Sequence, residues 1–184
     1  SSHKHPGAGA HESIHPTDWN RYNELDKIRD WRKQLSNFYA RDDRYLFELD
    51  GYKWGSVEHY FHANKFKDSH PNYYHEFTWD SGSELSRTKG AKVKRAGRHI
   101  KMSAEQVQRW NNCSRDVLAR SNRAKYQQND DLKKMLLLTK GAVLKHRASR
   151  FSQLTIENDL MQLREWFLLE ESITGYDVPL DGDL

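Results

Sequence analysis

One stretch of the sequence gathers side chains that can do chemistry: residues 51–68, which read GYKWGSVEHYFHANKFKD. If residues 56–67 form a helix, a turn of 100° per residue places Glu58, His62 and Lys65 in one stripe about 60° wide, flanked by aromatic rings. A carboxylate and an amine two turns apart on one face can hold a small polar ligand. The same spacing also occurs on ordinary solvated helices, so spacing alone leaves both interpretations open.

The stretch also contains a histidine pair whose spacing suits a metal ion. His59 and His62 lie three residues apart. A zinc site needs more ligands, but there is no C-x-x-C and no second close histidine pair, and Cys113 is the only cysteine. We therefore predict no metal, and histidines that pack in the core or face a ligand. G-x-G-x-x-G, Walker A and H-E-x-x-H motifs are also missing, so we expect no cofactor.

Positive charge is concentrated further along, in residues 87–101, which read RTKGAKVKRAGRHIK. Lysine and arginine at this density can hold phosphate groups through charge and bidentate hydrogen bonds. A solvated basic face is the alternative interpretation. The whole chain carries a formal net charge of +4, which is a mild bias toward anionic partners.

A predicted β-hairpin precedes the 56–67 helix and must position it. The run RYLFELDGYKW alternates apolar and polar side chains on either side of Asp50-Gly51, a strong signal for a two-residue turn. Ser56 follows as a suitable helix N-cap. The hairpin therefore leads directly into the helix that carries Glu58.

Helical patterns account for most of the remaining chain. Ser103 and Gln106 form a capping box at the start of the longest pattern, and Gly141 is suited to end the next one. The patterns predict one helix or two short ones at 17–33, short helices and loops at 69–90, and helices at 103–129, 131–141 and 157–171.

These elements predict an α+β fold, predominantly helical, in a single domain of residues 17–172 with a small N-terminal β-hairpin. Residues 1–16, rich in His, Gly and Ser, are expected to form a disordered leader, and residues 173–184 a loose tail. No apolar run approaches the roughly 20 residues that cross a bilayer, so no membrane partner is expected. The single cysteine favours a reducing compartment, cytoplasmic or nuclear.

Six short blocks of the sequence have an order and spacing that a known family shares. They are LSNFY, DGYKWGSVEHYFHANKF, AKVKRAGR, RW, RAKYQQN and LLLTKGAVL, at residues 35–39, 50–66, 91–98, 109–110, 123–129 and 136–144. They resemble the NADAR family, also called YbiA-like, whose members typically read S-N-F, then D-G-x-x-W, then S-x-E-H-Y-F-Q-A-x-K-F. The resemblance spans about residues 32 to 165 and implies a YbiA-like fold.

The resemblance implies cleavage of an N-glycosidic bond in a nucleotide-like substrate. Family members are linked to early riboflavin-pathway intermediates and to ADP-ribose attached to guanine bases. Both reactions break a bond between a ribose carbon and a nitrogen, through a transition state with positive charge on the sugar. A carboxylate near that carbon stabilises the charge or handles the proton of an attacking water. Glu58, which matches S-x-E-H, takes this catalytic role.

Lys65 matches the lysine of the K-F pair and is the second predicted catalytic residue. It can bind phosphate, protonate the departing base, or attack an opened ribose as an imine-forming amine. We favour the role of a fixed charge, because the sequence shows no feature that would lower the pKa of Lys65.

The resemblance also implies a set of substrate-binding residues around these two. Asn37 and Phe38 of S-N-F would position the sugar or the base, and Arg98 is the favoured phosphate-facing residue of the basic block. Lys125 is a further candidate phosphate contact, and the aromatic members either stack on the ligand or belong to the core. The predicted binding set is Asn37, Phe38, Tyr39, Trp54, His59, His62, Gly97, Arg98, Trp110, Lys125 and Tyr126.

The sequence departs from many bacterial members after residue 144. Those members carry a glutamate and then a W-G-x-G segment; here His146 stands about where the glutamate would be, and W-G-x-G is absent. A shorter loop implies a more open rim, which would admit a base within a nucleic acid and agrees with the basic 87–101 stretch. We therefore predict an N-glycosidase that acts on ADP-ribosylated guanine in a nucleotide or nucleic acid.

Two other functions remain open at this stage. One is the same chemistry on riboflavin-pathway intermediates. The other is a module that binds ADP-ribose or nucleic acid without turnover, and the presence of both Glu58 and Lys65 argues against it, because binding alone needs no carboxylate facing a phosphate-bearing ligand.

Overall fold

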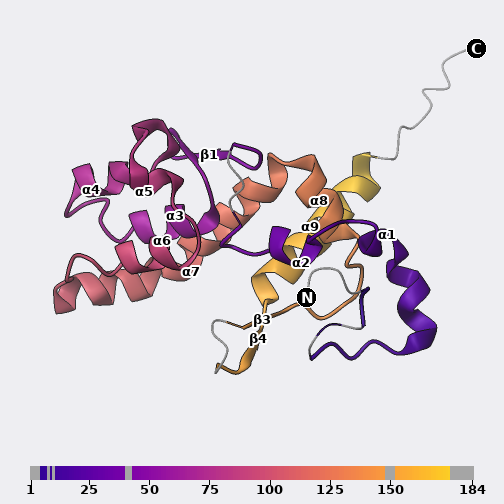
Figure 1. Ribbon diagram of the computed structural model, residues 1–184. Helices are drawn as coiled ribbons and strands as arrows, with labels where there is room; N and C mark the ends of the chain where they lie inside the picture. The colour runs from indigo at the N-terminus through magenta and orange to yellow at the C-terminus, as the bar shows by residue number, and fades with distance from the viewer. Residues whose placement is uncertain (1–4, 8, 10, 40–42, 148–151, 175–184) are drawn as a thin grey trace, which may run out of the picture.

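Two groups of helices share one long helix, α7, in the computed structural model (Figure 1). The structure describes residues 5–7, 9, 11–39, 43–147 and 152–174. The helices are η1 (Pro16–Tyr22), α1 (Asn23–Asp26), α2 (Trp31–Gln34), α3 (Val57–Ala63), α4 (Pro71–Glu76), η2 (Trp79–Ser81), α5 (Glu84–Arg87), α6 (Ala91–Ala96), α7 (Ala104–Gln127), α8 (Asp130–Leu137) and α9 (Asn158–Thr174). The strands are β1 (Phe47–Leu49), β2 (Tyr52–Trp54), β3 (Lys145–Arg147) and β4 (Leu154–Ile156). The fold is α+β and predominantly helical, as predicted.

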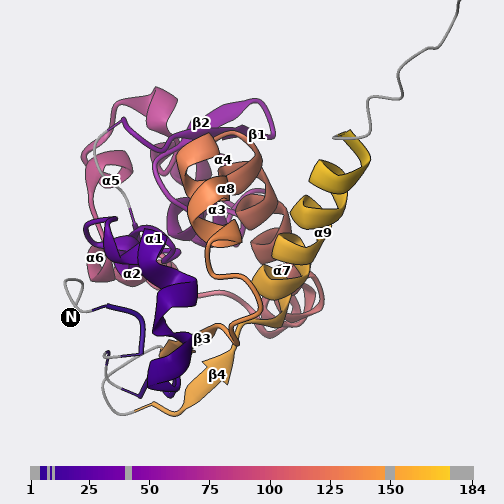
Figure 2. The same ribbon diagram turned by 90° about the vertical axis from the view of Figure 1, so that its right-hand side faces the viewer.

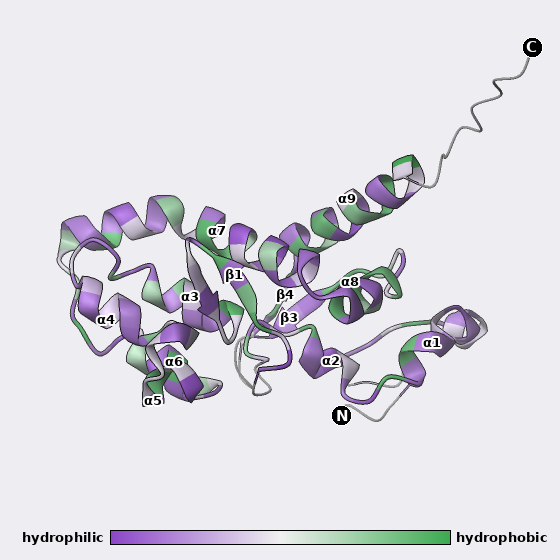
Figure 3. Cartoon of the chain, turned by 90° about the horizontal axis from the view of Figure 1, so that it is seen from above, coloured by the Kyte–Doolittle hydropathy of each residue, from purple (hydrophilic) through white to green (hydrophobic). Residues whose placement is uncertain are grey.

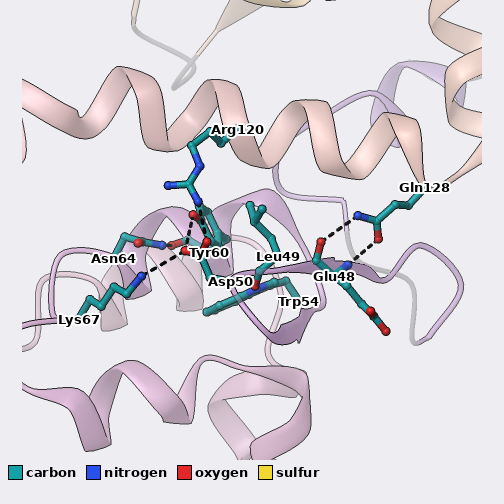
Figure 4. A network of polar contacts seen from close by, with 9 residues as sticks. All are labelled: Glu48, Leu49, Asp50, Trp54, Tyr60, Asn64, Lys67, Arg120 and Gln128. Atoms are coloured by element: carbon teal, nitrogen blue, oxygen red, sulfur yellow. Dashed lines mark hydrogen bonds and ion pairs between the residues drawn. The ribbon is translucent and has the colours of Figure 1, made fainter.

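The predicted hairpin is confirmed as β1–β2, an antiparallel pair with Leu49 opposite Tyr52. Its turn residues, Asp50 and Gly51, both have positive φ, at 54° and 80°, which is the geometry that favours Asp-Gly in two-residue turns. Figure 4 shows how the turn is fixed to the helices: the Asp50 carboxylate accepts hydrogen bonds from Tyr60 Oη at 3.0 Å and Lys67 Nζ at 3.3 Å.

Helix α7 holds the same hairpin from its other side. Arg120 donates to Asp50 Oδ1 at 2.5 Å, and the Gln128 side chain exchanges two hydrogen bonds with the backbone of Glu48, at 2.6 and 2.8 Å (Figure 4). The hairpin, α3 and α7 therefore form one connected unit. This unit fixes the start of α3, where Glu58 lies.

Helix α3 begins as predicted but ends earlier than the sequence indicated. Ser56 is its N-cap and accepts a hydrogen bond from His59 N. The helix was expected to reach Lys67, whereas α3 ends at Ala63 and Lys65 lies in the turns that follow. After Ala63 the backbone hydrogen bonds span three residues instead of four, from Lys65 N to His62 O and from Phe66 N to Ala63 O, which ends the α-helix.

Two hydrophobic clusters stabilise the two groups of helices. The first lies between the hairpin, α3, α4 and α7, around Trp54, Tyr60 and Phe66, all fully buried. The second joins α1, α7, α8 and α9, around Tyr126 and Phe167. Seen from above, α7 and α9 run along one edge of the molecule and the shorter helices lie on one side of them (Figure 3).

The later helices follow the sequence patterns closely. Helix α7 has the predicted capping box of Ser103 and Gln106, and α8 and α9 lie where they were expected. The end of α8 differs from the prediction. Gly141 was expected to terminate the helix, but α8 ends at Leu137, and the residue with positive φ after it is Lys140, at 48°. Helix α6 and the β3–β4 hairpin were not predicted.

The segment expected to be a disordered leader packs against the domain where it is described. Glu12 pairs with Arg32 at 2.5 Å and accepts from Gly7 N at 2.8 Å, and Pro6 is buried. Glu12 and Arg32 lie 20 positions apart in the chain, so the composition of the leader could not reveal their contact. The predicted tail falls almost wholly outside the described residues, and α9 extends to Thr174. No helix of the described chain is both long and apolar enough to span a bilayer.

Candidate active site

Glu58 and His62 form a hydrogen-bonded pair on α3. Their spacing of four residues places both side chains on the same face of the helix. His62 Nε2 lies 2.8 Å from Glu58 Oε1, and the two side chains are 5% and 13% exposed. A carboxylate has no proton to give, so the imidazole donates from Nε2. The sequence predicted this shared face, and the structure adds the direct contact.

Gly97 packs directly against the ring of His62. It follows the last turn of α6, and a Cβ atom added at this position would overlap Nδ1 and Cγ of His62. The backbone of α6 can approach α3 this closely only because residue 97 has no side chain. The Gly97 carbonyl also accepts a long hydrogen bond, 3.5 Å, from Lys65 Nζ. Gly97 therefore brings His62 and Lys65 to one place.

Lys65 lies in a half-buried position beside two aromatic rings. Its Nζ is 5.8 Å from the centroid of Phe61 and 5.7 Å from that of Trp110, and those two rings meet edge to face. Burial lowers the pKa of Lys65, the positive charge of Arg98 lowers it further, and Glu58 opposes the shift. The expectation that nothing lowers this pKa was therefore wrong, because the causes come from α6 and from packing that spacing does not reveal.

The segment from residue 34 to 37, which contains the start of S-N-F, is held by four consecutive backbone carbonyls. Asn37 O accepts from Glu58 N at 3.1 Å. Gln34 O and Ser36 O accept from Lys125 Nζ at 3.2 and 3.0 Å, and the carbonyl between them, at residue 35, accepts from Tyr126 Oη at 3.0 Å. Helix α7 thus places this segment against the first turn of α3.

Lys125 and Tyr126 are consequently interior residues. Lys125 is 2% exposed and Tyr126 is fully buried. Burial lowers the pKa of Lys125 to about 7 and raises the pKa of Tyr126. Lys125 was predicted as a phosphate contact, but its amine donates to backbone carbonyl groups of the 34–37 segment.

Two other predicted binding residues, Trp54 and His59, have side chains that are buried in the core. Trp54 is fully buried and donates from Nε1 to Leu49 O. His59 is buried between Ser56 Oγ, at 2.8 Å, and Leu85 O, at 3.2 Å, and burial lowers its pKa to about 4. Both side chains therefore serve the core, which was the alternative that the sequence left open.

The remaining predicted binding residues occupy less buried positions. Phe38 and Tyr39 are half-buried, and the ring of Tyr39 packs 5.6 Å from that of Tyr45 in the second cluster. Trp110 is half-buried next to Phe61, and Arg98 is exposed. The structure therefore gathers Glu58, His62, Lys65, Gly97, Arg98 and Trp110 into one corner, with the backbone of Asn37 beside it.

A cavity of about 870 Å³ adjoins the 34–37 segment. The leader, α1, the β3–β4 hairpin and α9 surround it, and Figure 2 shows the hairpin beside the N-terminal helices. Its lining includes Ser36, Asn37, Asn122 and His146 but not Glu58. Asn37 is therefore the link between the cavity and the Glu58 corner. Asn122 was missed by the sequence analysis; its only signal is its position one turn before Lys125.

A second, shallower hollow of about 430 Å³ lies on the basic stretch. Arg87, Lys89 and Lys92 line it, and the Arg87 guanidinium stacks 3.3 Å from the centroid of the Trp79 ring. In the described part of the chain, no three His, Cys, Asp or Glu side chains converge as a metal ion would require.

Comparison with known proteins identifies the family. A model of the NADAR domain matches residues 22–152, well over half of the chain. The chain belongs to the NADAR family. It is 31% identical over 120 residues to N-glycosidase YbiA of Shigella boydii serotype 4 (strain Sb227), an alignment that covers 60% of this chain and 68% of that protein.

The NADAR fold is also found among solved structures. The NMR structure of the Escherichia coli protein YbiA superposes with a TM-score of 0.55 at 26% identity, covering 76% of this chain and 80% of YbiA. Both findings agree with the resemblance read from the six sequence blocks, and the structural match confirms the predicted fold.

Proposed function

We propose that this NADAR protein is an N-glycosidase that hydrolyses the bond between ADP-ribose and a guanine base. The observation that carries the proposal is the Glu58 carboxylate, held by His62 at 2.8 Å and facing the same corner as the Lys65 amine. The reaction class is supported by the name of the Shigella relative, N-glycosidase YbiA.

The corner has the groups that this reaction needs. As the bond between the ribose carbon and the base nitrogen lengthens, positive charge develops on the sugar, and the Glu58 carboxylate stabilises it. The base leaves with the bonding electron pair and takes up one proton, which the attacking water replaces, so the reaction consumes one water in all. Water supplies the oxygen that ends on the ribose carbon, and Glu58 accepts a proton from it.

Lys65 has an amine that is suited to more than holding charge. Its lowered pKa increases the fraction of free amine, which is the nucleophilic form. In the covalent route, the amine nitrogen bonds to the ribose carbon as the base departs, ring opening gives an imine, and water then releases the sugar. We favour this route over a purely electrostatic role, because burial and Arg98 both act against the charged form.

Two features favour ADP-ribosylated guanine over a riboflavin-pathway intermediate. Arg98 at the Glu58 corner, and the hollow that Arg87, Lys89 and Lys92 line together with Glu84, give positive charge that suits the phosphates of a nucleotide or nucleic acid. The W-G-x-G segment of many bacterial members is absent after His146, and the β3–β4 hairpin there lines the cavity of about 870 Å³, which reaches Asn37 but not Glu58. We infer that a large substrate would extend from the Glu58 corner past Asn37 into this cavity.

Cleavage of a riboflavin-pathway intermediate is the alternative, since the same corner serves both substrates. An ADP-ribosylated guanine oligonucleotide and a riboflavin-pathway intermediate are offered to the protein in parallel, and products are separated by chromatography. The proposal predicts faster release of ADP-ribose from the oligonucleotide. If neither substrate is turned over while ADP-ribose binds, the protein is a binding module.

A further inference from the structure

His62 has one ring nitrogen that makes no hydrogen bond. Its Nε2 donates to Glu58, whereas Nδ1 is buried and has no partner among the described residues. A buried polar atom without a partner destabilises the folded state, so folded proteins keep few of them. That cost offsets part of what the hydrogen bond to Glu58 contributes, so stability alone is a weak reason for an imidazole at this position.

The surroundings of His62 leave its ring one orientation. Gly97 touches the Nδ1 side so closely that a Cβ atom there would overlap the ring. Phe61 packs edge to face with the imidazole, at 5.4 Å between centroids. With α6 behind it, the ring directs Nε2 to Glu58 Oε1. Since Nε2 carries the proton, Nδ1 is left with a lone pair against α6, which no donor among the described residues approaches.

We propose that His62 is a positioning residue for Glu58, and that Gly97 is the backstop that holds His62 in place. This inference rests on the proposed function. His62 fixes the oxygen Oε1 of Glu58, and no described residue hydrogen-bonds the other oxygen, Oε2, which is left for the substrate. The contact reaches from α3 to the end of α6, so the backbone next to Arg98 helps to set the position of the carboxylate.

A purely structural histidine would behave differently. Replacing it by a side chain of similar size would then lower stability and activity together. A positioning histidine predicts a large fall in kcat with little change in stability, because an apolar side chain relieves the unpaired Nδ1 but removes the hydrogen bond that orients Glu58. The two effects can be measured separately in the same variant.

The first test compares His62→Leu with His62→Gln. His62→Leu is expected to change the unfolding temperature little, because relief of the unpaired Nδ1 offsets the lost hydrogen bond to Glu58, to lower kcat on ADP-ribosylated guanine oligonucleotide by about 10- to 100-fold, and to leave KM within about twofold. His62→Gln keeps a donor, and glutamine is the residue that the family pattern has here, so it should recover at least about tenfold over His62→Leu. Wild-type kcat in His62→Leu, or a parallel loss of stability and kcat, overturns the inference.

The second test changes Gly97, whose contact holds the His62 ring in place. Gly97→Ala should lower kcat as His62→Leu does, because its methyl group displaces the ring. In a His62→Gly background both the ring and the Cβ atom that would lie 2.9 Å from the added methyl group are absent, so adding Gly97→Ala should cause little further loss. Gly141→Ala is the matched control, since a Cβ there meets only Arg21 Nη2, at 3.7 Å. Unchanged kcat in Gly97→Ala, or equal losses in both backgrounds, overturns the inference.

A third measurement does not depend on turnover. A long-range ¹H–¹⁵N spectrum of the whole protein should show His62 protonated at Nε2, and Glu58→Ala should weaken that preference. Protonation at Nδ1 in the wild type contradicts the inference even if the enzyme is active. Conversely, a protein that cleaves neither substrate but shows the Nε2 proton refutes the proposed function and leaves the Glu58–His62–Gly97 support intact.

Discussion

Two lysines from matched family blocks, Lys65 and Lys125, have opposite surroundings. Burial lowers the pKa of both. Lys65 is half-buried beside a carboxylate, an arginine and two aromatic rings, which leaves its amine within reach of a ligand. Lys125 is fully enclosed, and its amine donates to two backbone carbonyls. The same side chain is proposed to serve chemistry in one region and holds the backbone in place in the other.

The difference lies in the partners. Charged and aromatic neighbours at the edge of the core make Lys65 a candidate for acting on substrate. Backbone carbonyls inside the core make Lys125 a support for the 34–37 segment, whose last carbonyl meets Glu58 N. A family block therefore marks a residue that matters without saying whether it touches the ligand.

The largest expected effect belongs to the first region. Glu58→Gln keeps the shape and the hydrogen bond from His62 but removes the charge, so turnover should fall by about 100-fold or more. Unfolding temperature should change little, because the side chain lies at the edge of the core. Steady-state kinetics and thermal unfolding measure the two quantities. A large drop in unfolding temperature would mean that Glu58 belongs with Lys125 as a structural residue.

Lys65 tests whether the first region does covalent chemistry. Borohydride added during turnover should trap a protein–ribose adduct, detected by intact mass, because the free amine forms an imine. Lys65→Arg keeps the charge without a nucleophilic amine, so it should form no adduct and lose about 10- to 100-fold in turnover. No adduct together with near-normal turnover in Lys65→Arg would restore the purely electrostatic role.

The buried Lys125 should make the free energy of unfolding depend on pH. Its pKa is about 7 in the folded protein and near 10.5 when unfolded. Between these values the unfolded chain binds a proton that the folded chain does not, so wild-type stability should rise with pH, by up to about 1.4 kcal/mol per unit. Lys125→Met should lack this rise in urea unfolding from pH 7 to 10. The exposed Lys134→Met is the control, and an identical slope in both variants would contradict the assignment.

The hairpin and most of the helices could be predicted, because their signals are local. Asp50-Gly51 sets a turn, Ser56 a helix start, and Ser103 with Gln106 a capping box, each within a few residues. The stripe on α3 likewise follows from helix geometry. The sequence could therefore place Glu58 and His62 together.

Long-range contacts could not be predicted from the same patterns. His62 meets Gly97 across two helices, and Lys125 meets the 34–37 segment about 90 positions away along the chain. Whether a polar residue is buried depends on such contacts, so the sequence placed Lys125 on the ligand and left His59 open between the core and the ligand. The pairing of β3 with β4 was not predicted, because strands of three residues are too short to show an alternation of apolar and polar side chains.

The smallest effect concerns the leader. Deleting residues 1–16 removes the Glu12–Arg32 pair, whose side chains are 25% and 20% exposed, so we expect a loss of about 1 kcal/mol in unfolding free energy. Glu12→Gln should reproduce part of that loss, and Glu24→Gln, in an exposed pair with Lys27, should not. Unchanged stability after deletion would restore the original expectation of an independent leader.

The central claim is tested most directly by a parallel turnover assay of the wild type and Glu58→Gln. Both are given an ADP-ribosylated guanine oligonucleotide and a riboflavin-pathway intermediate at equal concentration, and the initial rates of base and ADP-ribose release are measured. The predicted result is faster release of ADP-ribose than cleavage of the riboflavin intermediate by the wild type, and loss of both activities in Glu58→Gln. Equal or faster cleavage of the riboflavin intermediate would contradict the substrate assignment, and normal turnover by Glu58→Gln would contradict the site itself.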